Sequence, residues 1–80
     1  MIDTSLLHTT DFGIIRIKKN LCIECDVVDY CKNLISSDKC SIIKRGKNFY
    51  CYIDDVIIVV NSYSYTIITA HRIGKKLWKK

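Results

Sequence analysis

The first half of the chain places its apolar residues at helical spacing. Between residues 11 and 21, Ile14, Ile17 and Leu21 recur every three to four positions, and basic residues occupy the other faces. A second apolar stripe of the same period runs from about residue 26 to residue 35. The pattern predicts two amphipathic helices, with Gly13 as a weak point in the first turn of the first one.

The second half changes to the alternation of strands. Phe49, Cys51 and Ile53 alternate with tyrosines, which indicates a strand with one packed face. The apolar run over residues 56–60 consists entirely of valine and isoleucine, which are β-branched, and it predicts a central strand covered on both faces or nearly so. The four predicted strands cover residues 41–44, 49–53, 56–60 and 65–71. Because their connections are short, consecutive strands are expected to be antiparallel neighbours.

These elements predict an α+β fold with two N-terminal helices on one face of a four-stranded antiparallel meander. The 80 residues are enough for one domain, expected over residues 1–73, followed by a basic tail over residues 74–80. Interpretations of the tail are an electrostatic arm for RNA, a membrane-surface anchor or a solubilising end. The chain is too short for separate cofactor and substrate domains, so no cofactor is expected.

The charge balance favours anionic partners. Thirteen Lys and Arg residues against eight Asp and Glu residues give a net charge of +5. The longest apolar run has five residues, far below the roughly 20 of a spanning helix, and no membrane partner is expected. The first residues lack the pattern of a signal peptide, so the expected location is the cytoplasm.

The five cysteines are interpreted as thiols rather than disulfides, because their number is odd and a cytoplasmic thiol pool is reducing. Cys22 and Cys25 have the spacing of a zinc knuckle. A tetrahedral zinc site needs four ligands, usually from two such pairs, and the sequence has no second pair. No metal is therefore expected, and the cysteines are predicted to be small buried apolar residues.

Most of the chain, roughly residues 7 to 72, resembles a family of small bacterial and phage proteins catalogued as a domain of unknown function. The resemblance lies in residues 8–13, 16–17, 20–21, 44–50 and 61–71. The family's order of elements is similar to that of the ribonuclease-toxin superfamily of barnase, EndoU, colicin D and RelE-type proteins. The resemblance implies RNA cleavage without metal, by a few polar side chains on an open sheet face.

Such cleavage needs a base, an acid and cations beside the phosphate. The chain has only two histidines, His8 and His71, and both lie in the segments that resemble the family. We expect them to meet at one edge of the sheet. In a regular strand Thr69 and His71 share a face with Ile67, so the Thr69 hydroxyl is expected beside His71, where it can orient the ring or bind a phosphate. The three predicted catalytic residues are His71, His8 and Thr69.

Residues on the opposite face of that strand, including Ser64 and Thr66, are the competing candidates. Tyr50 and Tyr52 are expected on an exposed face, either as stacking platforms for bases or simply as good strand formers. The basic candidates lie on the first helix, at the first hairpin turn and at the end of the last strand. The predicted RNA- or phosphate-binding residues are Arg16, Lys18, Arg45, Lys47, Tyr50, Tyr52, Ser64, Thr66 and Arg72.

The leading hypothesis is a small metal-independent endoribonuclease, toxin-like or a phage effector, that cleaves RNA by histidine-based acid–base chemistry. The alternative is a non-catalytic binding module on the same scaffold, which recognises RNA or inhibits a protein or defence complex. RNA is the expected partner, an acidic antitoxin or another protein is a further candidate, and a homodimer is left open.

Overall fold

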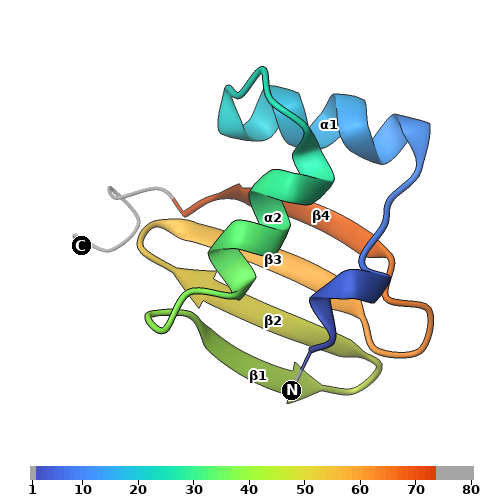
Figure 1. Cartoon of the computed structure of the whole chain (residues 1–80), viewed down its shortest axis with the longest axis vertical. Helices are drawn as coiled ribbons and strands as arrows, with labels where there is room; N and C mark the ends of the chain where they lie inside the picture. The colour runs from blue at the N-terminus through green and yellow to red at the C-terminus, as the bar shows by residue number, and fades with distance from the viewer. Residues whose placement is uncertain (1, 74–80) are drawn as a thin grey trace.

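The computed structural model describes residues 2–73, and Figure 1 shows them as two layers, with the helices on one side of a sheet. A 3-10 turn, η1 (Thr4–Leu6), precedes the helices α1 (Asp11–Leu21) and α2 (Val27–Ile35). The strands are β1 (Ser41–Arg45), β2 (Asn48–Ile53), β3 (Val56–Asn61) and β4 (Ile67–Arg72). They form one antiparallel sheet in the order β1-β2-β3-β4, with α1 packed mainly against β4 and α2 against β2. The predicted α+β fold is confirmed, and the predicted tail, residues 74–80, lies outside the described residues.

Each helix begins at a side-chain cap. The Thr10 hydroxyl accepts a hydrogen bond from the Gly13 N–H at 3.0 Å, and the Asp26 carboxylate accepts one from the Asp29 N–H at 3.0 Å. Helix α1 ends at Cys22, whose left-handed backbone (φ 57°) turns the chain out of the helix. These ends set the lengths of the two helices close to the predicted ones.

Two-residue turns fix the register of the first three strands. Gly46 has φ 63° and follows Arg45, which pairs with Asn48, so the first hairpin has glycine at the position where a type II′ turn requires a positive φ. Asp54 adopts φ 52° in the turn between β2 and β3. With connections this short, each strand lies beside the one before it.

The core lies between the sheet and the helices. Val56, Ile58 and Val60 of β3 alternate toward the helices and are at most 4% exposed. Burying each such side chain stabilises the fold by about 1.5–3 kcal/mol relative to leaving it in water. Further core residues are Ile2, Leu7, Ile17, Leu21, Val27, Cys31, Ile35, Cys51, Ile53, Ile67 and Ala70.

The cysteines divide into two groups. Cys31 and Cys51 are fully buried, and burial in the apolar core raises the pKa of each thiol to about 12. Cys40 is half-buried. Cys22 and Cys25 are exposed in the connection between the helices, so the prediction of buried cysteines is wrong for these two. Cys22 is the C-cap of α1, where the chain leaves the helix, so its side chain does not belong to the helix face that packs on the core.

Thiol labelling tests this division. Iodoacetamide at pH 8 is expected to modify Cys22 and Cys25 in the folded protein, because the thiolate is the reactive form and both side chains are accessible. Cys31 and Cys51 should be modified only after denaturation, since a pKa of about 12 leaves almost no thiolate at that pH. Peptide mass spectrometry gives the modified fraction at each site. Labelling of Cys31 as fast as Cys22 in the native protein would contradict the described core.

Candidate functional site

The segment just before α1 lies beside the first residue pairs of β4. His8 forms a parallel bridge with Thr66, 58 residues later in the sequence. The His8 N–H donates to the Tyr65 carbonyl at 3.3 Å, and the Ile67 N–H donates to the His8 carbonyl at 2.7 Å. The two segments that resemble the family most clearly, residues 8–13 and 61–71, are therefore in direct contact.

Side chains next to His8 hold it in this position. The Thr9 hydroxyl donates to the Ile67 carbonyl at 2.9 Å, and Thr10 caps α1. Gly13 faces Thr9 at such short range that a Cβ on Gly13 would overlap the Thr9 Oγ1 atom. Glycine is thus a requirement of this close packing, not a weak point in the helix.

The imidazole of His8 belongs to a chain of hydrogen bonds. Its Nδ1 atom lies 3.1 Å from the Leu6 carbonyl oxygen, and its Nε2 atom lies 3.1 Å from the Thr66 hydroxyl. A carbonyl only accepts, so the network assigns the proton of the neutral ring to Nδ1 and leaves Nε2 as the acceptor. The Ser64 hydroxyl lies 2.8 Å from that of Thr66. The Nε2 atom of the exposed His8 is therefore linked through the Thr66 hydroxyl to the Ser64 hydroxyl.

Asn61 shapes the turn that presents these hydroxyls. Its side-chain oxygen accepts hydrogen bonds from the N–H groups of Tyr63 and Ser64, both at 2.9 Å, and from the Ser64 hydroxyl at 3.3 Å. Tyr65 then adopts φ 59° and packs its ring against that of Phe49, with the ring centroids 6.2 Å apart. Asn61 was not among the predicted site residues, although the tendency of asparagine side chains to bind backbone N–H groups two or three residues later is a signal in the sequence.

A β-bulge interrupts the alternation of β4. Ile67 pairs with Val60 and Thr69 pairs with Val59, so Ile68 is an extra residue with no partner on β3. The Ile67 side chain is in the core, whereas Ile68 is 40% exposed. The prediction that Ile67 shares a face with Thr69 is therefore wrong, because it assumed unbroken alternation.

The bulge brings both sets of predicted residues to one face. Thr66 lies between Tyr65 and Ile67, which pack toward the helices, so it points to the other side of the sheet. After the bulge, Thr69 and His71 pair with residues that point to that same side. We call this side, away from α1 and α2, the open face (Figure 1). Thr66 and Thr69 were expected on opposite faces, and both are on the open face.

His8 and His71 do not meet. His8 lies next to Thr66, just before β4, and His71 lies five residues beyond Thr66, a separation of about 16 Å at about 3.3 Å per strand residue. Both are exposed. The structure therefore places the two histidines near opposite ends of β4, and the Nε2 atom of His8 lies within hydrogen-bond distance of the Thr66 hydroxyl.

The basic hairpin turn lies at the same end of the sheet as His8. The Ser62 N–H donates to the Lys47 carbonyl at 2.8 Å, which joins the β1–β2 turn to the β3–β4 turn. Arg45 pairs with Asn48, which pairs with Asn61, so these three residues form one row across the open face. Arg45 and Lys47 are exposed. Cationic, hydroxyl and imidazole groups thus gather at this end.

The two predicted tyrosines lie further along the open face. Tyr50 pairs with Val59 and Tyr52 pairs with Ile57. Tyr50 is half-buried and Tyr52 is 37% exposed. The tyrosines lie on the side of β2 opposite to the packed residues, as the alternation predicted.

Arg72, Arg16 and Lys18 are not on the open face. The Arg72 guanidinium forms a salt bridge with Asp55 at 3.2 Å and donates to the carbonyl of Leu21 at the end of α1. Arg16 and Lys18 belong to α1, in the other layer of the molecule. The structure therefore brings together His8, Ser64 and Thr66. Arg45 and Lys47 lie at the same end of the sheet but toward its β1 edge, and Arg16, Lys18 and Arg72 lie on the helix side.

Residues 2–73 contain neither a candidate metal site nor a candidate membrane-spanning helix. No three His, Cys, Asp or Glu side chains are grouped so that they could hold a metal ion, and Cys22 and Cys25 have no such third partner among these residues. Neither described helix has the length and apolar character needed to cross a membrane.

A family model with the description "Protein of unknown function" matches residues 1–71, which is nearly the whole chain. The chain belongs to the DUF3781 family. A search of curated proteins and a search of solved structures each gave no match. Both segments that meet at His8 lie inside the DUF3781 match, so the site is built from the part of the chain that defines the family.

A double-mutant cycle tests how this DUF3781 chain positions His8. Gly13→Ala is expected to destabilise the fold by about 1 kcal/mol or more, because its methyl group displaces the Thr9 hydroxyl from the Ile67 carbonyl. In a Thr9→Ala background the same change should be neutral or stabilising, since alanine is the better helix former by about 1 kcal/mol. Urea unfolding of the four proteins gives the coupling free energy. An equal effect of Gly13→Ala in both backgrounds would contradict the described contact.

Proposed function

We propose that this protein is a metal-independent endoribonuclease in which His8 is the catalytic base. The supporting observation is the His8–Thr66–Ser64 cluster, in which the Nε2 atom of the exposed His8 is linked to the two hydroxyl groups. The basic β1–β2 turn lies at the same end of the sheet. This cluster joins residues from the two ends of the described chain. The likeness in element order to ribonuclease toxins supports the proposal at the level of fold alone.

The hydrogen bonds of His8 suit the removal of a proton from a ribose. The Leu6 carbonyl oxygen lies near Nδ1 and keeps the proton there, so the lone pair of Nε2 points toward the Thr66 hydroxyl. An RNA 2′-hydroxyl that replaces the Thr66 hydroxyl as donor transfers its proton to Nε2. The 2′-oxygen then bonds to phosphorus, the bond from phosphorus to the 5′-oxygen breaks, and water protonates the departing oxygen. The products are a 2′,3′-cyclic phosphate and a 5′-hydroxyl.

Charge distinguishes the two ends of the open face. Arg45 and Lys47 lie at the His8 end, where they favour a phosphate and the negative charge that develops on it. Asp54 and Asp55 form the turn at the other end, next to His71. Arg72 pairs with Asp55 at that turn, so its charge is already neutralised there and is not free for a phosphate. The proposal therefore assigns the reaction to His8. Thr69 and His71 are assigned to RNA binding.

The tyrosines are proposed to bind the RNA strand as it leaves the reacting phosphate. Tyr50 and Tyr52 lie in successive rows across the open face, and aromatic rings on an open sheet are platforms for unpaired bases. In this proposal the RNA is single-stranded, and its chain runs from the His8 end toward the middle of the sheet. A toxin or phage-effector role, opposed by an acidic protein partner, belongs to the same proposal.

The second candidate is a non-catalytic RNA-binding module. It is favoured by the same tyrosines and by the absence of His71 from the His8 cluster, which leaves that cluster without a second histidine as acid. This candidate predicts RNA binding that survives loss of His8 and falls when Tyr50 or Tyr52 is replaced. RNA cleavage assays therefore distinguish the two candidates.

The test uses a labelled single-stranded RNA incubated with the protein in EDTA. Wild type and His71→Ala are expected to cleave it, whereas His8→Ala should lose about 10²–10⁴-fold in rate, the usual contribution of a general base. Thr66→Val should lose less of the rate, because Thr66 only positions the imidazole of His8, which remains present as the catalytic base. A strand of the same sequence made of DNA should remain intact, since it lacks the 2′-hydroxyl.

Three results decide the outcome. Cleavage with a 2′,3′-cyclic phosphate end that depends on His8 supports the nuclease. Salt-dependent RNA binding without cleavage overturns it in favour of the binding module. If the protein neither binds nor cleaves RNA, both candidates are wrong.

A further inference from the structure

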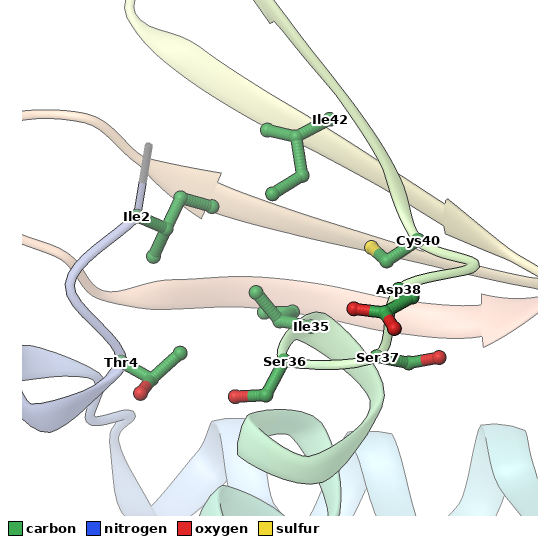
Figure 2. Close-up of a pocket in the computed structure, with 8 residues that line it drawn as sticks. All are labelled: Ile2, Thr4, Ile35, Ser36, Ser37, Asp38, Cys40 and Ile42. Atoms are coloured by element: carbon green, nitrogen blue, oxygen red, sulfur yellow. The ribbon is translucent and has the colours of Figure 1, made fainter.

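A hollow of about 460 Å³ lies on the helix side of β1, beside the end of α2. Figure 2 shows Ile2, Ile35 and Ile42 around it, with the Cys40 sulfur directed toward the same space. A second hollow of about 430 Å³ shares Cys40 and Ile42 and continues to Phe49. Together they form one groove along β1, which we call the β1 groove. Its apolar side chains are Ile2, Ile35, Ile42 and Phe49, and its polar lining is Thr4, Ser36, Ser37, Asp38 and Lys44.

The strand beside this groove has a free edge. Arg45 and Asn48 flank a two-residue turn, and in such a hairpin the flanking pair exchanges hydrogen bonds. By alternation Ile43 also faces β2, and the backbone N–H and C=O groups of Ile42 and Lys44 point away from the sheet. Among residues 2–73 no segment pairs with this edge, whereas the outer edge of β4 is paired at His8. The β1 edge can therefore accept another strand.

The surroundings of the groove are basic. Exposed cations lie along the turn before β1, in β1 and in the hairpin turn after it. Asp38, which lines the groove, is the single acidic residue between residues 30 and 53, so the cations outnumber it. Lys44 lines the groove itself. The cations are Lys39, Lys44, Arg45 and Lys47.

We propose that the β1 groove binds an extended protein segment in which acidic and apolar residues alternate. The segment adds a strand to the free edge of β1, its apolar side chains enter the groove beside Ile42, and its carboxylates approach Lys44 and the cations at either end of the strand. Backbone pairing contributes affinity, and the charges favour an acidic partner.

Other occupants fit these observations less well. A nucleic acid has no backbone N–H groups to pair with the edge of β1, and it would gain little from an apolar hollow. A second copy of this chain would bring two sets of the same four cations together, which is repulsive. The proposal does not depend on RNA cleavage, because the strand is expected to bind whether or not the His8 cluster is catalytic.

The probe is a fluorescein-labelled peptide of the sequence Val-Glu-Val-Glu-Val-Glu-Val, titrated with the full chain in the absence of RNA. Fluorescence anisotropy is expected to show saturable binding. The same peptide with methylated backbone nitrogens should bind about 10-fold more weakly or worse, because it cannot donate to β1. Lys44→Glu should weaken binding by about 10-fold, whereas the matched change Lys19→Glu on α1 should alter it less than about twofold.

Hydrogen exchange locates the bound strand. The Ile42 and Lys44 amides are expected to gain protection when the peptide is added, and thermal melting checks that Lys44→Glu remains folded. Equal binding of the methylated peptide, or equal effects of Lys44→Glu and Lys19→Glu, would overturn the proposal. So would the absence of saturable binding at millimolar peptide, protection of the same two amides by polyuridine, or their protection in a dimer without peptide.

Discussion

The pairing of His8 with the start of β4 is the contact on which the rest of this arrangement depends. Two backbone hydrogen bonds and the Thr9 hydroxyl hold the segment before α1 against Ile67. Thr10, the next residue, caps α1, so the same contact sets where that helix begins and which strand it covers. Because the contact joins residues 58 positions apart, closing it costs more chain entropy than closing any of the short strand connections.

The bulge in β4 reconciles two requirements that regular alternation cannot meet. Before it, Ile67 must enter the core while Thr66 remains beside His8. After it, Ala70 enters the core and Thr69 faces outward. Without the extra residue Ile68, one of these pairs would be reversed. A single inserted residue thus gives an open face that is polar along β4 and a helix-facing side that is apolar.

The sequence was sufficient for the elements and insufficient for the site. Apolar spacing predicts the two helices and the meander, because every strand connection is short and allows one topology. It does not reveal the bulge after Ile67, which has no signature in apolar spacing, nor the pairing of His8 with Thr66, which is a contact distant in sequence. Gly13 illustrates the difference: as a local signal it weakens a helix, and in three dimensions it makes room for Thr9.

The two edges of the sheet then have different consequences for function. The edge of β4 is paired at His8, so the groups that remain free to bind a ligand there are side chains rather than backbone N–H and C=O groups. The edge of β1 is unpaired within the described chain and lies beside the β1 groove, so in the proposal above its backbone groups bind the partner. The hairpin turn with Arg45 and Lys47 belongs to both regions. The two proposals therefore share the cations of this turn, because a strand bound at β1 and an RNA bound on the open face would both be attracted to the same positive charge.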